Sequence, residues 1–183
     1  MLYLASASPR RARLLKEASI RFKVLISGYH ERGGSRTGPA RLVKKHAMGK
    51  ALAASAKVRE GNVLAADTVV YFRGKIIGKP ARPAQAVSTL LSLQGRWHTV
   101  YTGVAFLRLK AGRIVQKNLF FEKTKVLLGA LDEKGVRAYF RRVNPMDKAG
   151  SYAIQSGHGG LVKDVRGSFS NAVGLPMERL TFL

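Results

Sequence analysis

The feature that most constrains the fold is a pair of long strands in the second half of the chain. The sequence predicts strands over His98 to Leu109 and Arg113 to Leu128, joined by the turn Lys110-Ala111-Gly112. Their length indicates a twisted antiparallel pair, because strands of L-residues twist in one sense. Any fold for this chain has to accommodate that pair.

The other segments mix helices and strands. Further strands are expected at Leu2 to Ala5, Phe22 to Ile26 and Val63 to Val70, with a hairpin return at Tyr71 to Ile77, and short strands around Gly157 to Gly160. Helices are expected from Pro9 to Lys16, from Pro39 onward, from Pro83 to Leu93, from Asp132 to Val143, and briefly after Gly174-Leu175-Pro176. The order lacks the regular alternation of a purely parallel sheet. We therefore expect an α/β or α+β architecture with a mixed sheet.

Composition narrows the class of protein. The 183 residues are 46% hydrophobic, enough for one domain over 1–183. Without cysteine, the chain can have no disulfide, thiolate zinc site or cysteine nucleophile. The longest apolar run, Val63 to Phe72, contains Asp67, so we expect neither a signal peptide nor a membrane span, and a cytoplasmic protein.

The charge predicts a polyanionic partner. Lys and Arg number 33 against 10 Asp and Glu, a formal net charge of +23. A nucleotide, a nucleic acid or an acidic surface would each respond to this field. The basic residues are spread along the chain without a run of five, which disfavours a disordered nucleic-acid-binding arm.

The passage from the first strand to the first helix suits an anion. Ser8 is a good N-cap residue and Pro9 fits the first helical position, so the N–H groups of that turn point outward. Arg10 and Arg11 add guanidinium donors that bind phosphate oxygens in pairs. A solvated basic helix start is the alternative.

Two acids are candidates for chemistry. Asp67 stands in an apolar strand, where an ionised carboxylate costs several kcal/mol unless a cation or strong donors accompany it. A strand-end acid that bonds backbone N–H groups is the alternative. Glu31 follows the strand at Phe22 to Ile26, and two such carboxylates could share Mg²⁺ or Mn²⁺ with phosphate oxygens. Glu31 could also be an exposed loop residue.

Three polar residues and one histidine remain. Lys79 lies in Gly78-Lys79-Pro80, where a lysine could meet a phosphate, although Pro80 rules out a Walker motif. Lys50, taken alone, reads as solvent-facing. Gln155 can both donate and accept hydrogen bonds, as a pyrimidine edge would require, or be a satisfied turn amide. His98 begins a core strand and is expected to be structural.

Several segments together resemble the Maf family of nucleoside triphosphate pyrophosphatases, in that family's order. They are Leu4-Ala5-Ser6-Ala7-Ser8-Pro9-Arg10-Arg11, Ala66-Asp67-Thr68-Val69-Val70, Gly78-Lys79-Pro80, Gly95-Arg96-Trp97-His98-Thr99-Val100, Asp147-Lys148-Ala149-Gly150-Ser151-Tyr152-Ala153-Ile154-Gln155 and Gly174-Leu175-Pro176. The resemblance spans nearly the whole chain. It implies the inosine-triphosphatase-like α/β fold, with a long bent mixed sheet flanked by helices and a nucleotide cleft between two lobes.

The resemblance also implies a reaction. A divalent metal, Mg²⁺ or Mn²⁺, would assist hydrolysis of a nucleoside triphosphate between the α and β phosphates. Asp67 would accept the proton of water and contact the metal, and Glu31 would be the second metal-associated acid. The expected triphosphate-binding residues are Ser6, Arg10, Arg11, Lys50 and Lys79.

The pattern is similar to the branch that acts on dTTP and UTP, which includes sanitation of modified pyrimidine nucleotides. Arg10, Thr68 and Gln155 are its specificity positions in this sequence. The alternative is a nucleic-acid-binding or cell-division regulatory protein on the same fold. As partners we expect the triphosphate and allow a homodimer, with nucleic acid disfavoured and no membrane.

Overall fold

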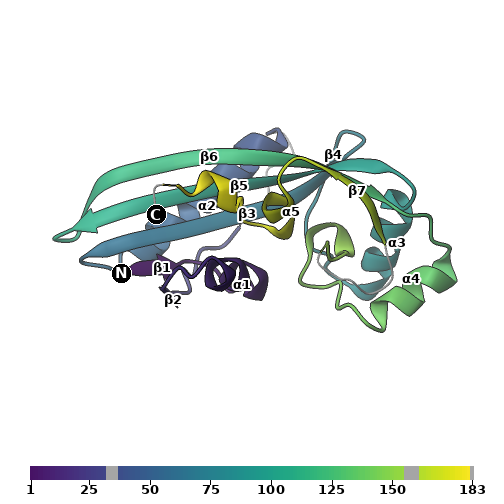
Figure 1. Ribbon diagram of the computed structural model, residues 1–183, viewed down its shortest axis with the longest axis horizontal. Coiled ribbons are helices and arrows are strands. Elements are labelled where there is room, and N and C mark those ends of the chain that lie inside the picture. The colour runs from purple at the N-terminus through teal and green to yellow at the C-terminus, as the bar shows by residue number, and fades with distance from the viewer. Residues whose placement is uncertain (32–36, 155–160, 182–183) are drawn as a thin grey trace.

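A computed structural model describes residues 1–31, 37–154 and 161–181. Its centre is one mixed sheet of seven strands in the order β2-β1-β3-β5-β6-β7, with β4 paired to the C-terminal end of β3, far from β1 (Figure 1). The strands are β1 Leu2–Leu4, β2 Phe22–Val24, β3 Gly61–Phe72, β4 Lys75–Ile77, β5 Trp97–Lys110, β6 Arg113–Leu128 and β7 Val162–Arg166. The helices are α1 Pro9–Glu17, α2 Pro39–Ser55, α3 Pro83–Leu93, α4 Glu133–Phe140 and α5 Phe169–Val173, with 3-10 turns η1 Ala149–Ser151 and η2 Met177–Arg179.

The long antiparallel pair is confirmed. β5 and β6 run side by side over their whole length, and β3 pairs antiparallel with β5 from Gly61 to Tyr71. The β5–β6 turn has Ala111 and Gly112 at φ 48° and 77°, the left-handed region that a tight hairpin requires. β1 pairs in parallel with both β2 and β3, which makes the sheet mixed as expected.

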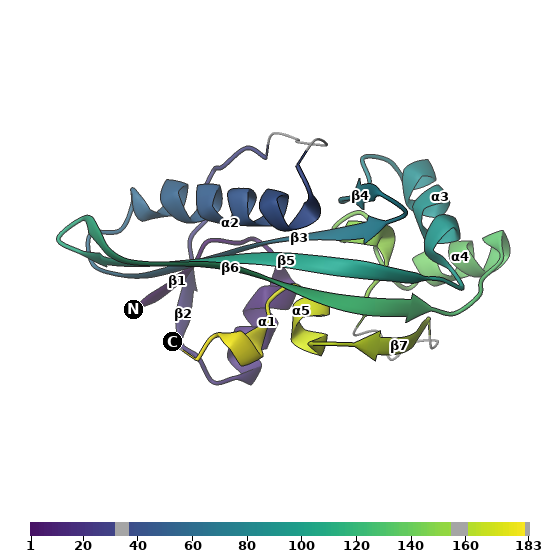
Figure 2. The ribbon, with the colours of Figure 1, turned by 90° about the horizontal axis from the view of Figure 1, so that it is seen from above.

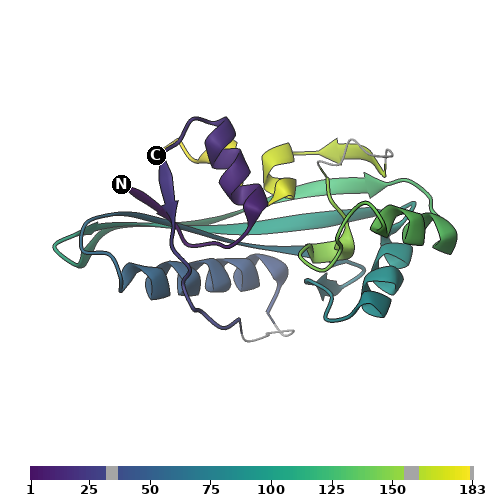
Figure 3. The ribbon, with the colours of Figure 1, turned by 90° about the horizontal axis from the view of Figure 1, so that it is seen from below.

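Helices cover both faces of this sheet. α2 lies along one face, over β3 and β5, while α1 and α5 lie on the opposite face (Figures 2 and 3). α3, α4 and η1 lie together at the end of the long strands opposite the β5–β6 turn (Figure 3). Successive residues of a strand point to opposite faces, so Val63 and Ala65 pack with α2, whereas Leu64 and Ala66 pack toward α1 and α5.

Gly103 on β5 explains how closely α2 approaches the sheet. A Cβ at this position would overlap the backbone carbonyl group of Val43 and lie 2.7 Å from the backbone nitrogen of Lys44. Because backbone atoms cannot swing aside like a flexible side chain, glycine at 103 is what lets α2 rest directly on β5. That contact fixes the height of the α2 side chains over β3.

Three expectations about secondary structure are wrong. The second strand ends at Val24 rather than Ile26, and α4 runs only from Glu133 to Phe140, with Asp132 as its N-cap, accepting a bond from the Gly135 N–H. Instead of a strand before the glycine-rich stretch there is η1, since Gly150 and Ser151 both have positive φ. The stretch 157–160 itself lies outside the described residues, and α5 was not predicted.

Within the described ranges, no helix combines the length and the apolar character needed to cross a membrane.

Candidate functional site

A cavity of about 750 Å³ opens at the edge of β3 that faces β1 and β4. β1 pairs with residues 62–64 of β3 and β4 pairs with residues 70–72, so in the described part of the chain 65–69 have no neighbouring strand on that edge. The cavity lies in this gap. The site residues expected from the sequence that line it are Ser6, Arg10, Arg11, Glu31, Lys50, Asp67, Thr68 and Lys79.

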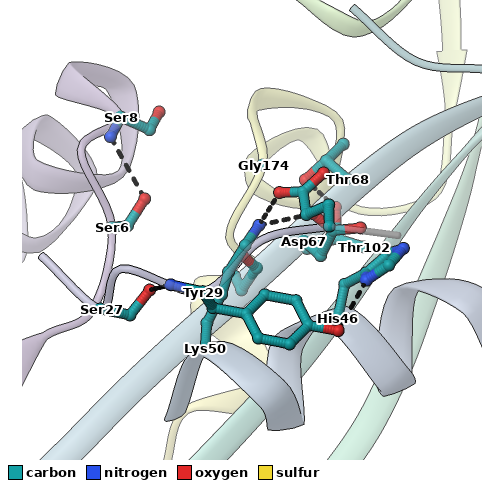
Figure 4. Close-up of polar contacts among 12 residues, drawn as sticks. Ser6, Ser8, Ser27, Tyr29, His46, Lys50, Asp67, Thr68, Thr102 and Gly174 are labelled. Carbon is teal, nitrogen blue, oxygen red and sulfur yellow. Dashed lines mark hydrogen bonds and ion pairs between the residues drawn. The ribbon is translucent and has the colours of Figure 1, made fainter. Parts of the chain in front are cut away.

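A partly buried lysine joins the two acids. Lys50 Nζ lies 2.7 Å from Asp67 Oδ1 and 2.6 Å from Glu31 Oε1 (Figure 4 shows the Lys50–Asp67 pair). The side chains of Lys50 and Asp67 are only 14% and 8% exposed, so the ammonium compensates a carboxylate that would otherwise be buried alone. Lys50 is therefore not solvent-facing, and Asp67 has the cation that its apolar strand requires.

The environment of Glu31 favours its charged form. Burial raises the pKa of Glu31. The hydrogen bond and charge of Lys50, together with the charges of His46 and Lys79, lower this pKa by more than burial raises it, so the net shift is downward. Lys79 is exposed at the rim of the cavity. The carboxylate thus stands among cations, ready to accept a cation or a donor.

The donor set suits a hard divalent metal. Both acids contact one nitrogen atom, so their nearest oxygens are separated by no more than the sum of the two Lys50 distances. Among residues 1–31, 37–154 and 161–181, no cluster of three His, Cys, Asp or Glu forms. Mg²⁺ commonly binds one or two carboxylates and completes its shell with phosphate oxygens and water. Glu31 and Asp67 fit that arrangement with a triphosphate present.

Arg10 crosses the cavity from the start of α1. Its Nη1 lies 2.6 Å from Asp147 Oδ2, and its Nη2 donates to the Asp147 carbonyl oxygen at 2.8 Å. Lys148 Nζ bonds the other carboxylate oxygen of Asp147 at 2.6 Å. Burial raises the pKa of Asp147, but bonds to these two cations lower it below its ordinary value. Arg10 and Lys148 are thus held at the cavity by one shared acid.

Arg11 is buried and organises the opposite side of β3. It donates from Nε to the Gly174 carbonyl oxygen at 2.8 Å, from Nη1 to Ser6 Oγ at 3.0 Å, and from Nη2 to Thr68 Oγ1 at 2.9 Å. Ser6 Oγ also accepts the Ser8 N–H at 3.2 Å (Figure 4), so among the described residues the Ser6 hydroxyl hydrogen has no acceptor and is free to donate. Ser8 stands at the N-cap position but makes no capping bond with its side chain, contrary to expectation.

The hydroxyl groups of Thr68 and Thr102 extend this hydrogen-bond network, and the donor in each of their bonds can be assigned. Thr102 Oγ1 donates to the Asn171 carbonyl oxygen at 3.0 Å, so its single hydrogen is engaged. In the 3.0 Å bond between Thr68 and Thr102, Thr68 must then be the donor. Thr68 accepts from Arg11 and donates to Thr102, so it can offer a ligand only a lone pair. Sequence reasoning missed Thr102, which carries no local signal of its role.

Gln155, the third expected specificity position, lies outside the described residues. The other predicted residues share one cavity, while their individual roles stay predictions. Two residues that sequence reasoning missed, Tyr29 and His46, also line it. The one available signal was that His46 precedes Lys50 by four positions, one turn along the same helix face.

His98 is a core residue, as expected. It is 3% exposed, and its Nε2 shares a 2.7 Å hydrogen bond with the hydroxyl of Tyr152, which lines the cavity. Burial lowers the pKa of His98 to about 4. The neutral imidazole therefore supports the segment that follows η1.

The buried His98 predicts a loss of stability in mild acid. The group's pKa is 6.5 when unfolded and about 4 when folded, so the unfolded chain binds a proton first. Full stability is present above pH 6.5 and falls as the pH drops toward 4, by about 3 kcal/mol from this residue. Urea unfolding at stepped pH measures this slope. In His98→Gln the slope should shrink over the same interval, and an unchanged slope would contradict the assignment.

Comparison with known proteins places the chain in a family. It is 42% identical over 182 residues to the "dTTP/UTP pyrophosphatase" of Gloeobacter violaceus, covering 100% of this chain and 93% of the relative. It is 39% identical over 179 residues to the protein of that name from Pelotomaculum thermopropionicum, covering 98% and 92%. The solved Staphylococcus aureus Ham1 protein aligns at 14% identity with a TM-score of 0.46, over 70% of this chain and 71% of that one, too distant to support an argument. The family model for Maf-like proteins matches residues 1–183, and the chain therefore belongs to the Maf family.

Proposed function

We propose that this protein is a metal-dependent nucleoside triphosphate pyrophosphatase that hydrolyses dTTP and UTP to the monophosphate and pyrophosphate. The observation that carries the proposal is the joining of Glu31 and Asp67 by Lys50 in a cavity lined with cations. A protein that only bound a phosphate backbone would gain nothing from carboxylates beside its anion site. The names of the relatives supply the substrate class.

Asp67 would act as the base. Its carboxylate would take a proton from a water molecule whose oxygen attacks the α-phosphorus, while the bond from that phosphorus to the bridging oxygen breaks and pyrophosphate leaves. Lys50, 2.7 Å from Asp67, would keep this carboxylate oriented and could turn toward a phosphate oxygen. Arg10, Lys79 and the free hydroxyl hydrogen of Ser6 would bind the other oxygens.

Mg²⁺ or Mn²⁺ between Glu31, Asp67 and the phosphates would offset the charge that develops on the leaving pyrophosphate. The net charge of +23 favours capture of the anionic substrate.

The apolar part of the cavity lining would receive the base. It includes Val70, Val100, Ile154 and Val173. Thr68 can only accept a bond from a ligand, which suits the N3–H of uracil and thymine and not the unprotonated N3 of cytosine. This polarity would support a choice of dTTP and UTP over CTP.

The test is pyrophosphate release by the purified protein from dTTP, UTP, CTP, GTP and 7-methyl-GTP, with Mg²⁺, with Mn²⁺ and with a chelator. We expect turnover of dTTP and UTP that the chelator abolishes. Turnover of none of the five would contradict the proposal. Steeply salt-dependent binding of DNA or RNA in the same preparation would then favour the nucleic-acid-binding alternative.

We further propose that the protein works in the cytoplasm and pairs as a homodimer. A chain without cysteine gains nothing from an oxidising compartment. Ile114, Val115 and Leu119 of β6 are exposed apolar residues that a second copy would cover. Sedimentation of the wild-type protein tests the dimer.

A further inference from the structure

A tyrosine in the loop between β2 and α2 lies against α2 beside the two acids. Tyr29 is half-buried, and its hydroxyl shares a 3.2 Å hydrogen bond with Nδ1 of the buried His46 (Figure 4). The two rings are tilted by 60° with centroids 5.9 Å apart. The Tyr29 N–H also donates to Ser27 Oγ at 3.3 Å. The contacts with His46 attach the loop to α2, and the Ser27 bond lies within the loop itself.

Gly49 provides the space for the tyrosine ring. A Cβ at this position would lie 2.5 Å from Cζ and 2.9 Å from Cδ2 of Tyr29, closer than real Cβ contacts come. The ring thus occupies the volume of a side chain at position 49. Glycine inside a helix is less favourable than alanine by about 1 kcal/mol. Gly49 does not have a positive φ that would require glycine, so the space taken by the tyrosine ring explains why this position has no side chain.

The attachment point is adjacent to the carboxylate pair along both chain segments. Lys50 directly follows Gly49 on α2, and Glu31 stands two residues after Tyr29. The Glu31 side chain is 52% exposed, so packing alone does little to hold it. An exposed acid on a loop loses side-chain and backbone entropy whenever it is fixed in one place. Because the Tyr29–His46 contact already orders the neighbouring backbone, less entropy is lost when Glu31 is fixed by a ligand.

We infer that Tyr29, seated on Gly49 and bonded to His46, is a positioning residue that holds Glu31 beside Lys50 and Asp67. The inference rests on the proposed function in one respect, that these acids bind a divalent metal. Groups that orient metal ligands without touching the metal typically change metal affinity by 10- to 100-fold when removed. Loss of the Tyr29 anchor is therefore expected to weaken metal binding roughly tenfold.

The experiment is a double-mutant cycle read by Mn²⁺ binding without substrate. Free Mn²⁺ is followed by electron paramagnetic resonance in wild type, Tyr29→Ala, Gly49→Ala and the double variant. Each single change should weaken Mn²⁺ binding about tenfold. The double variant should bind no more weakly than Tyr29→Ala, because the three atoms nearest to the new methyl group all belong to the tyrosine ring that this variant removes. Tyr29→Phe, which keeps the ring and loses only the His46 bond, should recover most of the affinity.

Two further measurements separate positioning from general damage. Gly49→Ala improves helix propensity, so its thermal midpoint should stay near that of wild type while its Mn²⁺ affinity falls. Gly135→Ala on α4 is the matched control, a glycine-to-alanine change in a helix whose residues do not line the cavity, and it should leave Mn²⁺ binding unchanged. With dTTP, the loss in Gly49→Ala should lie mainly in the metal concentration needed for half-maximal rate rather than in kcat.

The outcomes are distinguishable. Wild-type affinity in Tyr29→Ala and Gly49→Ala, or a Gly49→Ala effect that persists without the tyrosine ring, would overturn the positioning role while pyrophosphate release by wild type left the proposed function standing. A wild-type protein that neither binds Mn²⁺ nor releases pyrophosphate would overturn both.

Discussion

Replacing Asp67 by asparagine is expected to lower metal-dependent pyrophosphate release from dTTP by about 10³-fold or more while the protein stays folded. The change removes the proton acceptor, and a well-placed general base contributes about 10² to 10⁴ in rate. It also removes one of the two carboxylates that would hold the metal. Because the amide has nearly the shape of the carboxylate, it can still accept a bond from Lys50 at the same place in the cavity.

The control for this change is Asp164→Asn on β7, where the acid pairs with Arg166 at 3.3 Å and does not line the cavity. That variant should retain wild-type activity, since exposed ion pairs contribute little. Initial rates of pyrophosphate release, with circular dichroism to verify folding, distinguish the two. An Asp67→Asn protein with full activity would refute the assignment of Asp67 as base and metal ligand.

The site could be predicted where one residue conflicts with its local sequence. Asp67 was recognisable because a charge in an apolar strand needs a partner, and Arg10 and Arg11 because two guanidinium groups open a helix. Lys50 gave no such signal: on α2 it resembles any lysine of a basic helix. What makes it a partner of Asp67 is the contact of α2 with β5 at Gly103, which joins segments more than fifty residues apart.

The fold could be predicted where pattern alone decides, as in the long strands β5 and β6. It could not where distant contacts choose the backbone. η1 replaces an expected strand because Gly150 and Ser151 take positive φ, and the Gly150 N–H bonds the Gly78 carbonyl oxygen at 3.3 Å. α5 escaped notice because it has only five residues, and its buried Asn171 owes its place to Thr102 and Thr124 on β5 and β6.

Replacing Arg11 by methionine is expected to lower the free energy of unfolding by about 3 kcal/mol, because hydrogen bonds from a charged donor are worth about 1.5 to 3 kcal/mol and the partners become unsatisfied. The lost bonds go to the Gly174 carbonyl oxygen and to the hydroxyls of Ser6 and Thr68. Burial lowers the pKa of Arg11, the largest influence on it, so removing its charge also ends a desolvation penalty and limits the loss. Urea unfolding measures the difference.

Arg13→Met on the same helix is the matched control. Arg13 is exposed, and within the described residues its one ion pair is with Glu17 one turn away, so its replacement should change the free energy of unfolding by less than about 0.5 kcal/mol. Arg11→Lys distinguishes charge from geometry, because one ammonium group cannot reach three acceptors that a guanidinium fork spans. If lysine restores wild-type stability, charge alone is what the site requires. If lysine resembles methionine, the fork is essential, and the directions of the Ser6 and Thr68 hydroxyls depend on it, so KM for dTTP should rise in both variants.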